Sequence, residues 1–152
     1  MAYATAEARQ DLLDSIAEAT DHIGVALTAI GAAYEQLDEQ SADRLEEELF
    51  RPVQLAYGRA RRTHAGFAER HGLPGRTFEP GGPGHASQGV KGYLDAAVEA
   101  VREADLSLSA LQDSMRPVEV GDPELRAGLA DVRELIGTLP GRAKRFVSTF
   151  GR

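Results

Sequence analysis

The histidines are the first candidates for chemistry, because the chain has four of them and no cysteine. His64 and His71 are seven residues apart, or about 10 Å along a helix, which is too far for both to bind one zinc ion through bonds of about 2 Å. His71 ends a predicted helix and His85 lies within the loop predicted to follow it, so they stay open as a metal-binding pair. Neither Glu-x-x-His nor His-Glu-x-x-His occurs, which excludes the signatures of di-iron bundles and of zinc hydrolases.

Nucleophilic and nucleotide-dependent chemistry have little support in the sequence. There is no Gly-x-Ser-x-Gly motif and no cysteine nucleophile. Residues 84–92 (GHASQGVKG) come close to a phosphate-binding loop, but Lys91 is one residue late and Gly92 takes the place of the magnesium-binding hydroxyl. We therefore favour a non-catalytic protein, and we expect no cofactor.

Cationic side chains offer a different chemistry, the binding of an anion. Formal charge is +5 over residues 51–76 and +4 over residues 139–152, although the whole chain carries −7. If the fold brought these two blocks beside the glycine-rich segment, they would favour a phosphate-bearing small molecule or an acidic partner. The candidate ligand-binding residues are Arg59, Arg62, His64, Lys91, Arg142 and Arg145. The alternative is that these cations only complement helix dipoles.

The elements that would position these residues are four amphipathic helices. Apolar residues recur at alternating steps of three and four, which keeps them on one helix face. The sequence predicts helices at about residues 5–38, 42–71, 87–115 and 122–150. Their core stripes are Leu13, Ile16, Thr20, Ile23, Leu27, Ile30, Tyr34 and Leu37; Leu45, Leu49, Val53, Ala56, Tyr57, Ala60, His64, Phe67 and His71; Val90, Leu94, Ala97, Val101, Ala104, Leu108, Leu111 and Met115; and Leu125, Leu129, Val132, Ile136, Leu139, Ala143, Phe146 and Phe150.

Capping residues, prolines and glycines mark where these helices begin and are interrupted. Ser41 is the expected N-cap of the second helix, and Asp122 followed by proline starts the fourth. Pro52 predicts a kink or a new start in the second helix, and Pro140 predicts a kink in the fourth without a change of direction. Residues 72–89 hold six glycines and three prolines, so they predict one long loop between the second and third helices.

Together these elements predict an all-α fold. The expected architecture is an antiparallel up-down-up-down four-helix bundle with one long Gly/Pro-rich loop, forming a single domain over residues 1–152. In that topology the C-terminal halves of the second and fourth helices reach the same end, so the two basic blocks would converge there. A longer helical hairpin that completes its core by dimerising is the alternative.

Composition limits the remaining function classes. The N-terminus lacks a basic region leading into an apolar stretch, so we expect no secretory signal and a cytoplasmic location. The uncharged residues 22–34 are too few for a membrane span, and the net negative charge disfavours sequence-specific nucleic-acid binding. We therefore predict a protein that acts by binding a protein partner or by self-association. The alternative is small-molecule, anion or metal binding at the basic end.

Overall fold

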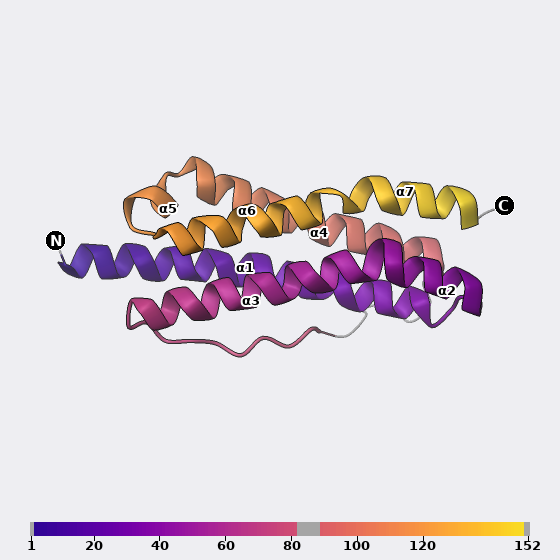
Figure 1. Cartoon of the computed structure of the whole chain (residues 1–152), viewed down its shortest axis with the longest axis horizontal. Coiled ribbons are helices and arrows are strands. Elements are labelled where there is room, and N and C mark those ends of the chain that lie inside the picture. Colours follow the sequence, from indigo (N-terminus) through magenta and orange to yellow (C-terminus); the bar gives the residue numbers. More distant parts are fainter. Residues whose placement is uncertain (1, 82–88, 151–152) are drawn as a thin grey trace.

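The part of the chain that can be described folds into helices. The computed structural model describes residues 2–81 and 89–150, and no strand occurs among them (Figure 1). The prediction of an all-α fold is confirmed. The elements are α1 (Ala2–Tyr34), α2 (Glu39–Leu45), the π-helix η1 (Glu46–Phe50), α3 (Arg51–Arg70), α4 (Val90–Asp113), α5 (Arg116–Glu119), α6 (Pro123–Gly137) and α7 (Leu139–Phe150).

Two sets of these elements follow one another end to end as columns. α2, η1 and α3 run on without a break. α6 and α7 are separated only by Thr138, whose backbone stays close to helical values (φ −84°, ψ −15°). Pro52 lies inside the first column, just after η1, where it leaves one backbone carbonyl without its usual donor. Pro140 lies in the first turn of α7, where proline is best tolerated in a helix. The α6–α7 column therefore keeps its direction, as the sequence predicted (Figure 1).

One of the two predicted N-caps is confirmed by the structure, and the other is wrong. Asp122 caps α6, because its side chain accepts a hydrogen bond from the Leu125 amide (2.8 Å). The expected N-cap Ser41 instead lies inside α2. Its amide donates to the side chain of Asp38 (2.7 Å), which is the actual cap.

Contacts near the helix ends fix the direction of each column. Arg70 at the end of α3 pairs with Asp122, which precedes α6, and α2 lies beside the end of α7. α3 and the α6–α7 column are therefore antiparallel. The side chain of Arg9 near the start of α1 donates to the carbonyl of Val120, which follows α4 and α5. α1 and α4 are therefore antiparallel as well.

The prediction of an up-down-up-down topology is wrong. α1 runs in one direction, α3 and α4 both run in the opposite direction, and the α6–α7 column returns (Figure 1). α1 packs against α3 and α4, and α6 packs against the same two helices. Neighbouring columns are therefore still antiparallel, while the parallel helices α3 and α4 lie diagonally across the bundle.

The reason for this order is the path of the segment between α3 and α4. Its described part, residues 72–81, contains no helix or strand and runs back along α1 and α3 (Figure 1). Arg76 pairs with Asp21 of α1 (2.9 Å), and Phe78 is buried. An extended chain covers about 3.3 Å per residue against 1.5 Å in a helix, so residues 72–81 can span about the length of the 20-residue helix α3. The predicted loop also includes residues 82–88, which lie outside the described residues.

The predicted convergence of the basic blocks at one end is wrong for the same reason. Arg70 lies where α6 begins, whereas Arg142 and Arg145 belong to α7, which runs to the other end of the bundle (Figure 1). Because α3 and α7 are antiparallel, their C-terminal ends point in opposite directions. The described residues therefore form no single basic end.

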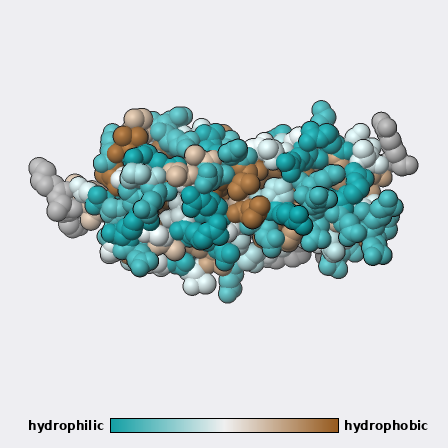
Figure 2. Space-filling view, in the orientation of Figure 1, coloured by the Kyte–Doolittle hydropathy of each residue, from teal (hydrophilic) through white to brown (hydrophobic). Residues whose placement is uncertain are grey.

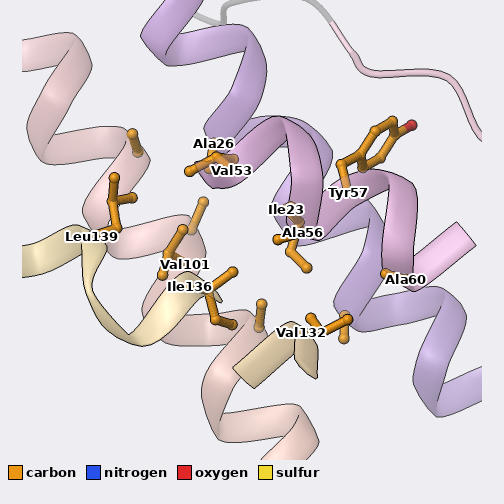
Figure 3. Close-up of a cluster of buried hydrophobic side chains, with 14 of the residues drawn as sticks. Ile23, Ala26, Val53, Ala56, Tyr57, Ala60, Val101, Val132, Ile136 and Leu139 are labelled. Atoms are coloured by element: carbon orange, nitrogen blue, oxygen red, sulfur yellow. The ribbon is translucent and has the colours of Figure 1, made fainter. Parts of the chain in front are cut away.

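The predicted stripes form the core of the bundle. Figure 3 shows Ile23, Val53, Val101 and Ile136, from four different helices, gathered in one apolar cluster, and none of them is more than 2% exposed. Every stripe residue is buried or half-buried except Met115, which follows the end of α4, and Phe150 at the end of α7. Burial of such side chains contributes about 1.5–3 kcal/mol each, which is what holds the columns together.

Candidate functional site

A groove follows the line where α3 meets the α6–α7 column, and we call it the seam groove. It is open to solvent and has a volume of about 670 Å³. Arg59, Arg62 and Arg142 all line it. The structure thus brings together three of the six candidate ligand-binding residues, although they lie along a flank of the bundle and not at its end.

The floor of the seam groove is apolar. Pro52, Leu55 and Leu135 line it, and Leu55 is 56% exposed. Figure 2 shows apolar surface in the middle of this face, over α3 and the junction of α6 with α7. Leu55 lies between the buried residues Val53 and Ala56, but its own side chain points away from the core. Packing within this chain therefore does not explain why a leucine is placed here.

Arginines form the wall of the seam groove that α3 contributes. Arg59 Nε donates to Asp131 Oδ2 across the seam (3.0 Å). Arg51 and Arg62 are exposed, and neither has an ion-pair or hydrogen-bond partner among the residues that the structure describes. Two guanidinium groups are therefore available to carboxylates of another molecule.

The opposite wall carries carboxylates toward one end and an arginine toward the other. Asp131 and Glu134 belong to α6. Arg142 Nη1 of α7 donates to the backbone carbonyl of Glu48 (3.2 Å). This carbonyl lies four residues before Pro52, which has no N–H to donate to it. Arg142 therefore supplies a donor where proline has removed one.

The other three candidate residues lie outside the seam groove, and two of them are on the surface. Arg145 lines a separate hollow together with Arg44. Lys91 lies in the first turn of α4 and pairs with Asp95 one turn later (2.9 Å). The six candidates therefore do not form a single site.

His64, the remaining candidate, is buried. It is 3% exposed, its ring makes an edge contact with Phe78 (centroids 5.0 Å apart), and its Nδ1 has no hydrogen-bond partner within the described part of the chain. Burial, helped by the charge of Arg76, lowers the pKa of His64 below its ordinary value of 6.5, although Asp14 and Asp21 oppose this shift. The neutral imidazole is therefore favoured, and it lies behind the segment of residues 72–81.

His71 is held by a carboxylate. Its Nε2 lies 3.0 Å from Asp122 Oδ2, and Asp122 also accepts two hydrogen bonds from Arg70 (2.8 and 2.9 Å). Burial disfavours the charged form of Asp122, but these bonds and the one from the Leu125 amide outweigh it and hold the pKa of this carboxyl well below its usual range. The cluster ties the end of α3 to the start of α6.

The metal hypothesis paired His71 with His85. His85 lies outside the described residues, so this pair stays a prediction. Within residues 2–81 and 89–150, no group of three or more histidine, aspartate or glutamate side chains is placed to hold a metal ion.

Comparisons with known proteins find no match among protein-family models, curated proteins or solved structures. Among the described helices, none has the length and apolar character needed to cross a membrane. Function therefore has to be inferred from the surface chemistry of the helices.

Sequence reasoning missed two residues of these surfaces. Leu55 is an apolar residue off the α3 core stripe, and its isolation on the polar face of that helix is a signal that could have singled it out. Arg44 carries no such signal, because its neighbourhood depends on where α7 ends in the fold.

Proposed function

We propose that the chain is a non-catalytic protein, a bundle of four helical columns, that associates with a second copy of itself through the seam groove. The observation that carries this proposal is Leu55, a leucine held 56% exposed on the floor of an open groove. Complete burial of a leucine side chain contributes about 1.5–3 kcal/mol, so covering this floor is favourable.

The charges on the groove walls favour a second copy as the occupant. Arg51, Arg62 and Glu47 line the groove from the α2–α3 column, and Glu134 lines it from α6. The described residues offer no ion-pair partner to any of the four. A surface with unpaired groups of both signs can complement itself. In a two-fold interface the same patch from two copies meets, so groups of opposite sign placed at equal distances on either side of the axis face each other.

A two-fold axis near Leu55 brings opposite charges together. In an antiparallel crossing of α3 with its copy, residues equally far before and after Leu55 become neighbours. Arg62 is seven positions after Leu55, and Glu47 is eight positions before it. The Arg62 of each copy therefore meets the Glu47 of the other, about 10 Å to either side of a central contact between the two leucines.

The like charges in this arrangement are balanced. Arg59 would approach Arg51 of the second copy, but Arg59 already pairs with Asp131 (3.0 Å). Glu134 on the same wall supplies a further carboxylate. The interface therefore joins arginines to carboxylates on both sides of its apolar centre.

Sedimentation equilibrium over a wide range of protein concentration tests this proposal. The wild-type chain should show a monomer–dimer equilibrium. Leu55→Glu should weaken the dimer about tenfold or more, since each tenfold corresponds to about 1.4 kcal/mol and the substitution buries a charge. Arg62→Glu should also weaken it, and adding Glu47→Arg should restore association, because the swapped charges again face opposite charges.

The matched control is Leu106→Glu, because Leu106 is a similarly exposed leucine (63%) on α4, away from the seam groove. It should leave the equilibrium unchanged, and circular dichroism should report the same helicity for every variant. A wild-type chain that stays monomeric at all concentrations contradicts self-association and favours a different protein as the occupant of the groove. Equal effects of the two leucine substitutions would also contradict it.

A further inference from the structure

A second hollow lies beyond the end of the seam groove, between α2–η1 and α7, and we call it the arginine hollow. It has a volume of about 440 Å³ and is lined by Arg44, Glu48, Arg142, Arg145 and Thr149. Of these, Arg142 also lines the seam groove. Three guanidinium groups thus come from two segments that are far apart in the sequence.

Two of the three guanidinium groups are held in place by neutral partners. Arg44 Nη2 donates to Thr149 Oγ1 (2.7 Å), and the Arg44 guanidinium lies over the ring of Phe146 (5.3 Å to the centroid). Arg142 donates one hydrogen bond to the backbone carbonyl of Glu48 (3.2 Å). Because each guanidinium has five N–H donors, both keep donors for another acceptor after these contacts are made.

The charge of the arginine hollow is not balanced from within. Glu48 is the one carboxylate among its lining residues, and it approaches Arg44 Nε only to 3.8 Å, which is beyond hydrogen-bond distance. Arg145 is exposed and its side chain has no partner in the described part of the chain. Three cations and one anion leave an excess of two positive charges.

We propose that the arginine hollow binds a phosphate group, either free phosphate or the phosphate of a small ester. A phosphate monoester carries about −1.5 to −2 charges at neutral pH, which matches the excess charge of the lining. Guanidinium groups bind such oxyanions through two parallel hydrogen bonds, which a lysine cannot form. Arg145 lines the site as an exposed cation, while Arg44 and Arg142 provide donors that Thr149 and the Glu48 carbonyl hold in place. This binding is independent of the self-association proposed above.

Isothermal titration calorimetry of the full chain with inorganic phosphate tests the site, with glycerol phosphate in a second titration and sodium chloride at matched ionic strength as the blank. Both phosphates should bind saturably at one site per chain. Tighter binding of inorganic phosphate would assign the site to the free ion, and tighter binding of glycerol phosphate would assign it to an ester. Arg145→Gln should weaken binding at least tenfold, because it removes one of the three cations.

Glu48→Gln provides a readout that damage to the fold cannot imitate. Removing the opposing carboxylate should strengthen phosphate binding severalfold. Arg61→Gln is the matched control, since Arg61 is an exposed arginine of α3 that lies over the ring of Tyr57 (4.8 Å), away from the hollow. It should leave binding unchanged.

Several outcomes would overturn the phosphate site. These are no saturable heat with either phosphate, unchanged affinity in Arg145→Gln, or an equal loss in Arg61→Gln. Leu55→Glu separates this proposal from self-association, because it should weaken the dimer and leave phosphate binding intact.

Discussion

His64 is a residue whose ionisation depends on the fold. Its imidazole lies on the core stripe of α3 and under Phe78, with Nδ1 unpaired among the described residues. The sequence predicted His64 both as a core residue and as a candidate ligand-binding residue. The structure shows a side chain that is only 3% exposed, which agrees with the core position. Burial therefore couples the ionisation of His64 to the stability of the fold.

The lowered pKa of His64 predicts the direction of this dependence. As pH falls below about 6.5, the unfolded chain takes up a proton at His64 that the folded chain does not, so the free energy of unfolding decreases until the pH passes below the folded pKa. Urea unfolding at pH 7 and at about pH 5 measures the effect. His64→Leu should lose less stability over this interval than the wild-type chain.

The result against this interpretation would be equal pH dependence in the wild type and in His64→Leu. Such a result would mean that His64 becomes protonated in the folded state as readily as in the unfolded state.

At the scale of the elements, Gly128 sets how closely α6 approaches α3. A Cβ at this position would collide with the side chain of Thr63, whose hydroxyl donates to the Arg59 carbonyl (2.8 Å) and therefore has a fixed orientation. Sequence periodicity predicted both helices and their buried faces. It could not predict this contact, because the contact depends on which columns become neighbours.

Two alanine substitutions in the same helix test the role of Gly128. Gly128→Ala should lower the free energy of unfolding by about 1–3 kcal/mol, because the added methyl overpacks the seam between α3 and α6. Gly137→Ala should raise it by up to about 1 kcal/mol, since its Cβ meets nothing within 4 Å and alanine favours the helix. Urea unfolding of both variants measures the difference. Midpoints that shift in the same direction would contradict the close approach.

At the scale of the whole molecule, periodicity and capping predicted the helices, whereas the path of the segment between α3 and α4 determines how the helices are arranged. Apart from Met115 and Phe150, the predicted stripe residues are buried or half-buried, and Asp122 starts α6 as expected, because spacing and capping act within a few turns. The direction of α4 depends on residues 72–81, which contact α1 and α3 through Arg76 and Phe78. The glycines and prolines of this segment do not specify where the chain goes next. The sequence therefore could not distinguish a loop that turns directly into α4 from one that first runs back along the bundle.

The same limit explains the candidate site. The sequence grouped Arg59, Arg62 and Arg142 by charge, and the structure places them along one groove. The expectation of a single basic end depended on a topology that the fold does not have. The exposed floor at Leu55 and the arginine hollow both arise from the antiparallel contact of the α2–α3 column with the α6–α7 column, which no local pattern specifies.

Self-association through the seam groove is tested most directly by a single cysteine on the proposed two-fold axis. The chain has no cysteine of its own, so Leu55→Cys introduces one thiol per copy at the centre of the interface. Two such thiols lie close enough to join when their Cβ atoms approach to about 4 Å. Under mild oxidation, Leu55→Cys should form a disulfide-linked dimer on a non-reducing gel, and Leu106→Cys should stay largely monomeric. A monomeric Leu55→Cys, or equal linkage of both variants, would contradict the proposed interface.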